Sequence, residues 1–130
     1  MRKLFGIFCL AMLLCVFNSC TRSEEKTVEK TAKEFYLSYQ NMDFNEIVEY
    51  CTPLMTERMR SIESGLTPES RKMQLEKLKS FSMTVETVEF NADTTAAVAT
   101  CSFVQSNTKE KFTDKMELQK ISGVWKISEF

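Results

Sequence analysis

Residues 81–90, FSMTVETVEF, mark the point where apolar residues change from helical spacing to strand spacing. In this stretch, apolar and polar residues alternate in two runs that are one position out of phase: Phe81, Met83 and Val85, then Val88 and Phe90. The alternation predicts a half-buried strand. The change of phase predicts a β-bulge near Glu86-Thr87.

Strand spacing continues to the end of the chain. A second predicted strand, residues 94–105, follows a turn and carries these residues on one face: Ala97, Ala99, Cys101 and Phe103. A third strand follows the turn at residues 106–108, and its alternate positions are Phe112, Asp114, Met116 and Leu118. Ser122-Gly123 then predicts a tight hairpin before a last strand over residues 124–130.

The preceding half of the chain has helical spacing. A helix of about 15 residues is predicted first, with this apolar stripe: Val28, Ala32, Phe35, Tyr36 and Tyr39. Cap residues predict three further helix starts, at Asp43, at Thr52-Pro53 and at Thr67-Pro68. Their apolar faces are Phe44, Ile47, Val48 and Cys51; then Met55, Met59 and Ile62; then Met73, Leu75 and Leu78. This order predicts an α+β fold, with N-terminal helices packed on a bent antiparallel sheet of about four strands.

The first twenty residues predict a bacterial lipoprotein signal. Met1-Arg2-Lys3 is basic, residues 4–17 are apolar, and Asn18-Ser19-Cys20 places a small residue before a cysteine. This layout predicts export, a diacylglyceryl thioether on Cys20 and cleavage before it, so that residues 1–19 are removed. The apolar run is shorter than the roughly 20 residues that span a bilayer. An uncleaved anchor and plain secretion are the open alternatives.

Residues 20–26 have two interpretations. They can be a lipidated cysteine and a short polar tether, because the segment has no aromatic residue. They can also include the first turn of a helix, where the dipole favours acids such as Glu24 and Glu25. Acids just after the cysteine resemble the surface-export signal of Bacteroidota lipoproteins. The expected location is the cell envelope, at the outer membrane on its periplasmic or surface side, with one domain over residues 27–130.

Charge and composition exclude several classes of function. Removing residues 1–19 takes away Arg2 and Lys3, which leaves 15 basic against 18 acidic residues and a net charge of −3. Such a chain is not expected to bind nucleic acid or to be drawn electrostatically to anionic lipid. The sequence contains no histidine. Histidine-based triads and histidine-ligated zinc are therefore excluded, and no cofactor is indicated.

Two cysteines remain in the domain, Cys51 and Cys101, and neither lies in a CxxC pair. A metal site is therefore not expected. In an oxidising compartment the two could form a disulfide, which would stabilise the fold by roughly 4 kcal/mol in the chain-entropy model. The alternative is a pair of buried free thiols that act as small hydrophobic residues.

Four segments carry a resemblance to a known family: AKEFY (32–36), DFNEIV (43–48), TP (52–53) and MELQKISGVWKI (116–127). Together they resemble the nuclear transport factor 2-like superfamily, also called cystatin-like or SnoaL-like. More narrowly, they resemble small uncharacterised lipoproteins of Bacteroidota with such a domain. The resemblance would cover about residues 27–130 and implies a cone with a pocket between the first helices and the sheet. Members include isomerases, dehydratases, transport adaptors and ligand carriers, so the fold does not select one activity.

The implied pocket has a candidate lining and a candidate acid. The residues expected to line it, or else simply to form the core, are Tyr36, Tyr39, Phe81, Phe103, Phe112, Met116 and Trp125. Isomerases of this superfamily use an acidic base in the pocket. Asp114 is in phase with Phe112 and Met116, so it would point inward, where burial would raise its pKa. The open alternatives are that a strand twist or register slip faces it outward, or that it pairs with a neighbouring lysine.

We derive three hypotheses for function from these observations. The first is a lipid-anchored, non-catalytic protein that binds a small apolar ligand or a peptide in the pocket. The second is an interaction protein, either a homodimer through the outer sheet face near Val98 and Val104 or an accessory subunit of an envelope complex. The third is an isomerase-like or dehydratase-like enzyme with Asp114 as the base.

Overall fold

The computed structural model describes residues 22–130. The predicted signal peptide and Cys20 lie outside these residues. The N-terminal helix extends through residues 22–40. Residues 22–26 of the segment after Cys20 are therefore helical.

Three helices and one short 3-10 helix follow the N-terminal helix: α2 (Phe44–Ile47), η1 (Val48–Tyr50), α3 (Pro53–Ser64) and α4 (Pro68–Lys79). The predicted caps are confirmed. Asp43 accepts a hydrogen bond from the Glu46 amide at 3.3 Å, and Thr52 accepts one from the Met55 amide at 3.3 Å. Thr67 and Ser70 form a reciprocal capping box at the start of α4. The starts of the helices are thus determined locally.

The N-terminal helix ends in a Schellman motif, in which two amides bond back to the last helical carbonyls. The Asp43 amide donates to the Ser38 carbonyl at 3.1 Å, and the Met42 amide donates to the Tyr39 carbonyl at 3.0 Å. Met42 has φ = 50°, the left-handed conformation that this motif usually assigns to glycine. Its side chain is buried in the core, which offsets the backbone strain.

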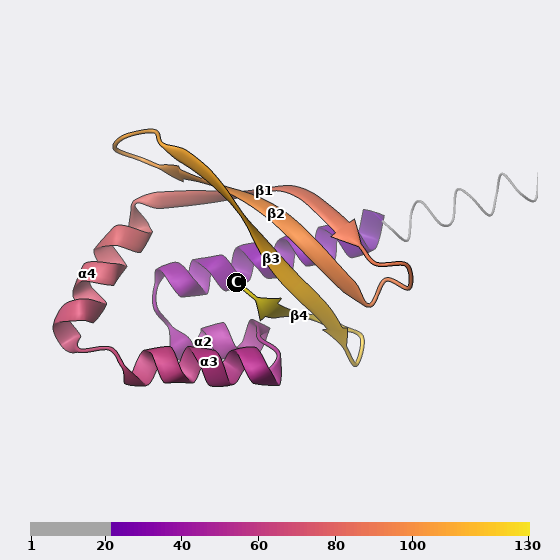
Figure 1. The fold of residues 1–130 in the computed structure, drawn as a ribbon, viewed down its shortest axis with the longest axis horizontal. Coiled ribbons are helices and arrows are strands. Elements are labelled where there is room, and N and C mark those ends of the chain that lie inside the picture. The colour runs from indigo at the N-terminus through magenta and orange to yellow at the C-terminus, as the bar shows by residue number, and fades with distance from the viewer. Residues whose placement is uncertain (1–21) are drawn as a thin grey trace, which may run out of the picture.

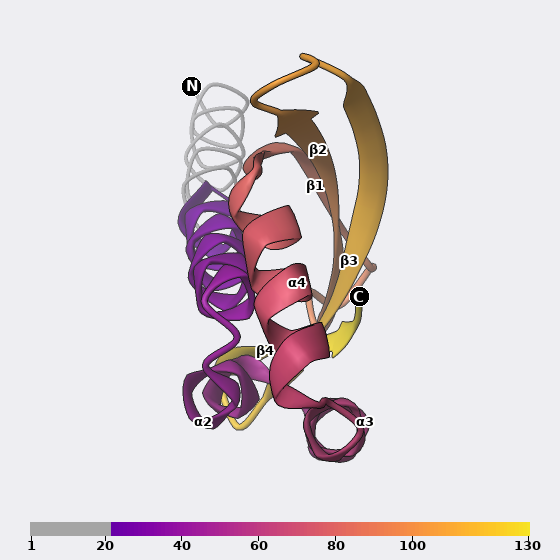
Figure 2. The same ribbon diagram turned by 90° about the vertical axis from the view of Figure 1, so that its left-hand side faces the viewer.

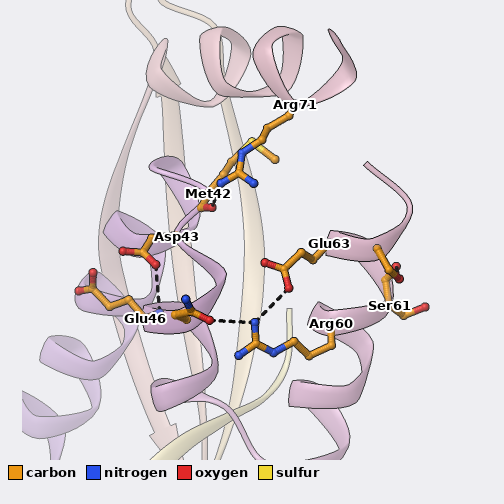
Figure 3. Close-up of polar contacts among 9 residues, drawn as sticks. Met42, Asp43, Glu46, Arg60, Ser61, Glu63 and Arg71 are labelled. Carbon is orange, nitrogen blue, oxygen red and sulfur yellow. Dashed lines mark hydrogen bonds and ion pairs between the residues drawn. The ribbon is translucent and has the colours of Figure 1, made fainter. Parts of the chain in front are cut away.

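Arginine side chains connect the helices at this end of the molecule (Figure 3). Arg71 on α4 donates to the carbonyl oxygen of Met42 at 2.9 Å, and this contact is partly buried. Arg60 on α3 donates to the Asn45 side chain of α2 at 3.1 Å and to Glu63 at 3.0 Å. The strained turn after the N-terminal helix is therefore held by α4, and α2 is held by α3.

The sheet is a simple meander of four antiparallel strands in the order β1-β2-β3-β4. Its strands are β1 (Phe81–Phe90), β2 (Ala96–Gln105), β3 (Lys111–Ile121) and β4 (Val124–Glu129). The predicted bulge is confirmed, since the β1–β2 register shifts between Val85 and Thr87. The predicted hairpin is also confirmed: Ser122 and Gly123 have φ values of 51° and 79°, which a type I′ turn requires.

The helices lie on one side of the sheet, and the sheet curves around them (Figures 1 and 2). The core lies between these two layers. Its buried apolar residues are Val28, Ala32, Phe35, Tyr36, Met42, Phe44, Ile47, Cys51, Met55, Met59, Ala97, Ala99, Cys101, Phe103, Met116, Leu118, Trp125 and Ile127. The predicted α+β fold, with N-terminal helices on a bent four-stranded sheet, is confirmed.

Three local expectations were wrong. Ile62 on α3 and Met73 on α4 are 42% and 66% exposed, although both were expected to face the core. No residue of α4 is fully buried, because this helix covers only one end of the molecule (Figure 1). The second strand begins at Ala96 and not at residue 94, since the Asn91 side chain accepts hydrogen bonds from the amides of Thr95 and Ala96.

Candidate ligand pocket

A pocket of about 370 Å³ opens between the N-terminal helix, the end of α4 and the first three strands. Six of its nine lining residues are aromatic. The lining residues are Tyr36, Tyr39, Lys77, Leu78, Phe81, Phe103, Phe112, Asp114 and Phe130. The volume lies near the lower end of the range of roughly 300–1,000 Å³ that is typical of small-molecule sites.

The aromatic rings of the pocket contact one another in a continuous series. The ring centroids of Phe103 and Phe112 are 4.9 Å apart in a stacked pair, and Phe81 meets Phe112 edge-on at 5.6 Å. Tyr36 meets Phe103 edge-on at 5.2 Å. On the other wall, Tyr39 and Phe130 lie 5.1 Å apart. These contacts fix the orientation of the rings and leave flat apolar surface toward the pocket.

Two tyrosine hydroxyls add polar groups to this apolar wall. Burial raises the pKa of Tyr36, and the neighbouring Tyr39 raises it further. Burial also raises the pKa of Tyr39. Both phenols are therefore protonated at neutral pH and can donate a hydrogen bond to a ligand oxygen.

Gln40 holds the floor of the pocket in place. Its side-chain amide donates to the carbonyl oxygen of Leu78 at 3.0 Å and to that of Phe81 at 2.6 Å. Leu78 lies at the end of α4 and Phe81 begins β1. One side chain of the N-terminal helix thus fixes the junction where both of these pocket residues are found.

Asp114 lines the pocket but is exposed, whereas a buried carboxylate was expected. Its side chain accepts a hydrogen bond from the amide of Lys115 at 2.8 Å. The β2–β3 hairpin extends beyond the helices at this end, as Figure 2 shows. The apolar enclosure that a general base would need is therefore not present around Asp114.

The remaining predicted lining residues divide into two groups. Tyr36, Tyr39, Phe81, Phe103 and Phe112 line the pocket together, whereas Met116 and Trp125 are fully buried elsewhere in the core. The β3–β4 hairpin lies against the N-terminal helix at Glu24, to which Lys120 and Trp125 bind. Trp125 there packs against Phe90 at 5.7 Å between ring centroids.

The buried indole of Trp125 has a specific polar partner. Its N–H donates to Oε2 of Glu24 at 2.6 Å, and Oε1 of Glu24 accepts from the Lys120 ammonium at 2.7 Å. Both hydrogen bonds lower the pKa of Glu24, and the one from Lys120 has the larger effect. We call this group the Glu24 clamp; it joins the first turn of the N-terminal helix to the β3–β4 hairpin.

Three lining residues were not anticipated: Lys77, Leu78 and Phe130. Leu78 carried the signal of an apolar helix face, but helical spacing cannot show which helix end meets the sheet. Phe130 follows the last strand, and its ring packs edge-on against Phe35 and Tyr39 of the N-terminal helix. That contact joins residues more than ninety positions apart in the sequence, so no local pattern predicts it.

Cys51 and Cys101 are separate, buried free thiols in the structure. Burial raises the pKa of each thiol to about 11. Both thiols are therefore protonated at neutral pH and are poor nucleophiles. As free thiols, both side chains pack in the core as small hydrophobic residues.

A second hollow, of about 420 Å³, lies at the end of the sheet where the β1–β2 turn is found. Val98 lines it between two acids, since Glu89, Val98 and Glu117 are register neighbours on adjacent strands. Val104, the other residue considered for a sheet-face contact, is partly buried and does not line this hollow.

Two further observations concern residues 22–130. No helix of this part of the chain is both long and apolar enough to cross a membrane. The same residues contain no cluster of three or more Cys, Asp or Glu side chains that could hold a metal ion.

Comparison with known proteins shows the fold alone. No protein-family model and no curated protein matches this sequence. Among solved structures, the chain is similar to a candidate NTF2-like transpeptidase from Campylobacter jejuni, with a TM-score of 0.50 and 13% identity over 78% of this chain and 97% of that one. The intermembrane-space region of the chloroplast protein ARC6 gives a TM-score of 0.32 at 14% identity over 78% and 92%, which is too low to support an argument. The first likeness shows an NTF2-like fold over the part of the chain that it covers.

Proposed function

We propose that this protein is a lipid-anchored protein of the bacterial cell envelope whose domain binds a small apolar ligand, or an apolar peptide side chain, without converting it. The aromatic pocket is the observation on which the binding role depends. Its rings are held by mutual contacts, and its opening carries Lys77 and Asp114. This arrangement suits a flat apolar group with a polar or charged end near the opening.

The proposed anchor depends on the lipoprotein signal at residues 1–19 and on Cys20. A non-catalytic role is supported by the surroundings of the candidate reactive groups. Cys51 and Cys101 are buried, protonated thiols, and Asp114 is exposed to solvent. None of these three side chains has the setting of an activated nucleophile or a general base.

The binding role can be tested with 1-anilinonaphthalene-8-sulfonate, a flat aromatic anion whose fluorescence rises in apolar sites. The probe is titrated into residues 22–130, which contain the whole described core. Phe112→Ala removes a ring that is 48% exposed, so the fold should survive while the dissociation constant rises roughly tenfold. Val124→Ala is the control, because Val124 is 53% exposed and lies outside the pocket.

Equal affinity in the Phe112 and Val124 variants would contradict the binding role, as would a native protein that does not bind the probe. If binding is found, native mass spectrometry after incubation with an extract of the source cells would give the mass of the natural ligand. That added mass should be reduced in the Phe112→Ala protein.

A protein-interaction role is the second candidate, and the hollow around Val98 favours it. Glu89 and Glu117 flank that hollow, so two copies meeting there about a two-fold axis would bring like charges together. A basic partner therefore fits this surface better than a second copy of the chain. Sedimentation of the pure protein should give a monomer, and Val98→Asp should leave the affinity for the aromatic probe unchanged.

A further inference from the structure

The turn between β3 and β4 carries two exposed apolar side chains. Ile121 and Val124 are 39% and 53% exposed, and they are register partners on either side of Ser122-Gly123. Register partners project from the same face of a two-stranded ribbon. The two side chains therefore form one apolar spot, which we call the hairpin tip, at the outermost point of this strand pair.

The hairpin tip is fastened to the beginning of the N-terminal helix. Lys120 and Trp125 are also register partners, one pair further from the turn, and both bind the carboxylate of Glu24. The Lys120 amide in addition donates to the Thr95 carbonyl at 2.8 Å. Figure 1 shows the helix start and the turns β1–β2 and β3–β4 at the same end of the molecule, with α4 at the opposite end.

Chain length limits how far this end can lie from the lipid proposed on Cys20. Cys20 and Glu24 are four residues apart in the sequence, and such a segment spans at most about 14 Å even when fully extended. The headgroup layer of one leaflet is roughly 5–8 Å thick. The clamp, and with it the hairpin tip, therefore stays within reach of the headgroup layer.

We propose that the hairpin tip is a membrane contact: Ile121 and Val124 enter the headgroup layer of the bilayer that holds the lipid on Cys20. This inference depends on the lipid anchor in the proposed function. Residues 118–128 contain Lys120 and Lys126 and no acid, although the mature chain as a whole is acidic. An anionic lipid surface therefore repels the hairpin tip less than the rest of this acidic chain. The charge of Lys120 is already neutralised by its ion pair with Glu24. The contact holds the pocket at a set height and orientation above the membrane.

The test uses the full chain, produced with its lipid and reconstituted in vesicles of phosphatidylcholine and phosphatidylglycerol. An environment-sensitive nitrobenzoxadiazole label is attached at Val124→Cys and, as the matched control, at Met73→Cys on α4, which is 66% exposed at the opposite end. Cys51 and Cys101 are buried, so the label enters the introduced thiol. The label at position 124 should emit at shorter wavelength and be quenched several-fold more by doxyl-labelled lipid than the label at position 73.

The outcomes separate the inference from the proposed function. A lipidated protein that binds the aromatic probe but shows equal quenching at both positions overturns the membrane contact alone. If the intact mass of the protein shows that Cys20 carries no lipid, both the proposed anchor and the membrane contact are overturned. Adding Glu24→Ala to the protein labelled at position 124 should weaken the quenching, because both hydrogen bonds that tie the tip to the anchored end are then lost. Unchanged quenching in that variant would also count against the proposed geometry.

Discussion

Replacement of Glu24 tests the clamp between the N-terminal helix and the β3–β4 hairpin. The carboxylate accepts two short hydrogen bonds, from Lys120 at 2.7 Å and from the Trp125 indole at 2.6 Å. Trp125 is only 3% exposed, so an indole N–H without a partner would cost about 1–3 kcal/mol. The side chains of Glu24 and Lys120 are 29% and 28% exposed, so solvent partly screens that ion pair.

These contacts predict different costs for two variants. In Glu24→Gln the remaining carbonyl oxygen can still accept from the indole, and Lys120 turns to solvent. We therefore expect the free energy of unfolding to fall by about 1–2 kcal/mol. In Glu24→Ala both partners are lost, and we expect a fall of about 2–4 kcal/mol.

Urea denaturation at neutral pH, followed by far-ultraviolet circular dichroism, measures these differences. Glu25→Gln is the control, because Glu25 has the same charge and, within residues 22–130, no side chain donates a hydrogen bond to its carboxylate. A Glu24→Ala protein within 0.5 kcal/mol of the unmodified protein would refute the argument. So would equal losses in the alanine and glutamine variants, because the indole would then contribute nothing. In a Trp125→Phe background the cost of Glu24→Ala should be smaller, by about 1–2 kcal/mol.

Three other predictions concern Gln40, the two buried thiols and the pH dependence of stability. Gln40→Leu leaves two carbonyl oxygens without their donor and should lower stability by about 1–3 kcal/mol; an unchanged melting temperature would show that this side chain does not hold the α4–β1 junction. Cys51 and Cys101 should not react with Ellman's reagent in the native protein and should both react after unfolding without reductant, whereas a lack of reaction after unfolding would indicate a disulfide. Glu24 and Glu86 have lowered pKa values, chiefly through hydrogen bonds from Lys120 and Ser102 respectively. The unfolded chain then binds more protons than the folded one as the pH falls below about 4.5, so the melting temperature should drop there, and a flat profile down to about pH 3 would contradict this reasoning.

The helix starts and the sheet could be predicted because their signals are local. Thr52-Pro53 and Thr67-Pro68 satisfy orphan amides within three or four residues, so tertiary contacts are not needed to place them. The bulge between Val85 and Thr87 appears in the sequence as a change of phase in one strand. Helical spacing also predicted the apolar face of the N-terminal helix, because that face is buried along its whole length.

Predictions failed where burial depends on a distant element. Met73 has the spacing of a core residue, but α4 covers only one end of the molecule and leaves this side chain in solvent. Asp114 is in phase with Met116, yet Asp114 lines the open pocket and is exposed, whereas Met116 is buried. Alternation along a strand states which residues share a face. It does not state how far along the strand that face is covered.

The amino-acid order alone was sufficient for the fold class, the helix caps, the bulge and the Ser122-Gly123 turn, because each of these depends on neighbours a few positions away. It also indicated five of the seven residues expected to line the pocket. The assembled fold was needed to show the other members of the site. Met116 and Trp125 are buried outside the pocket, Trp125 against Glu24 of the N-terminal helix, and the last residue, Phe130, returns to the pocket. The Glu24 clamp joins groups about a hundred positions apart, and a contact of that range leaves no periodic trace in a single sequence.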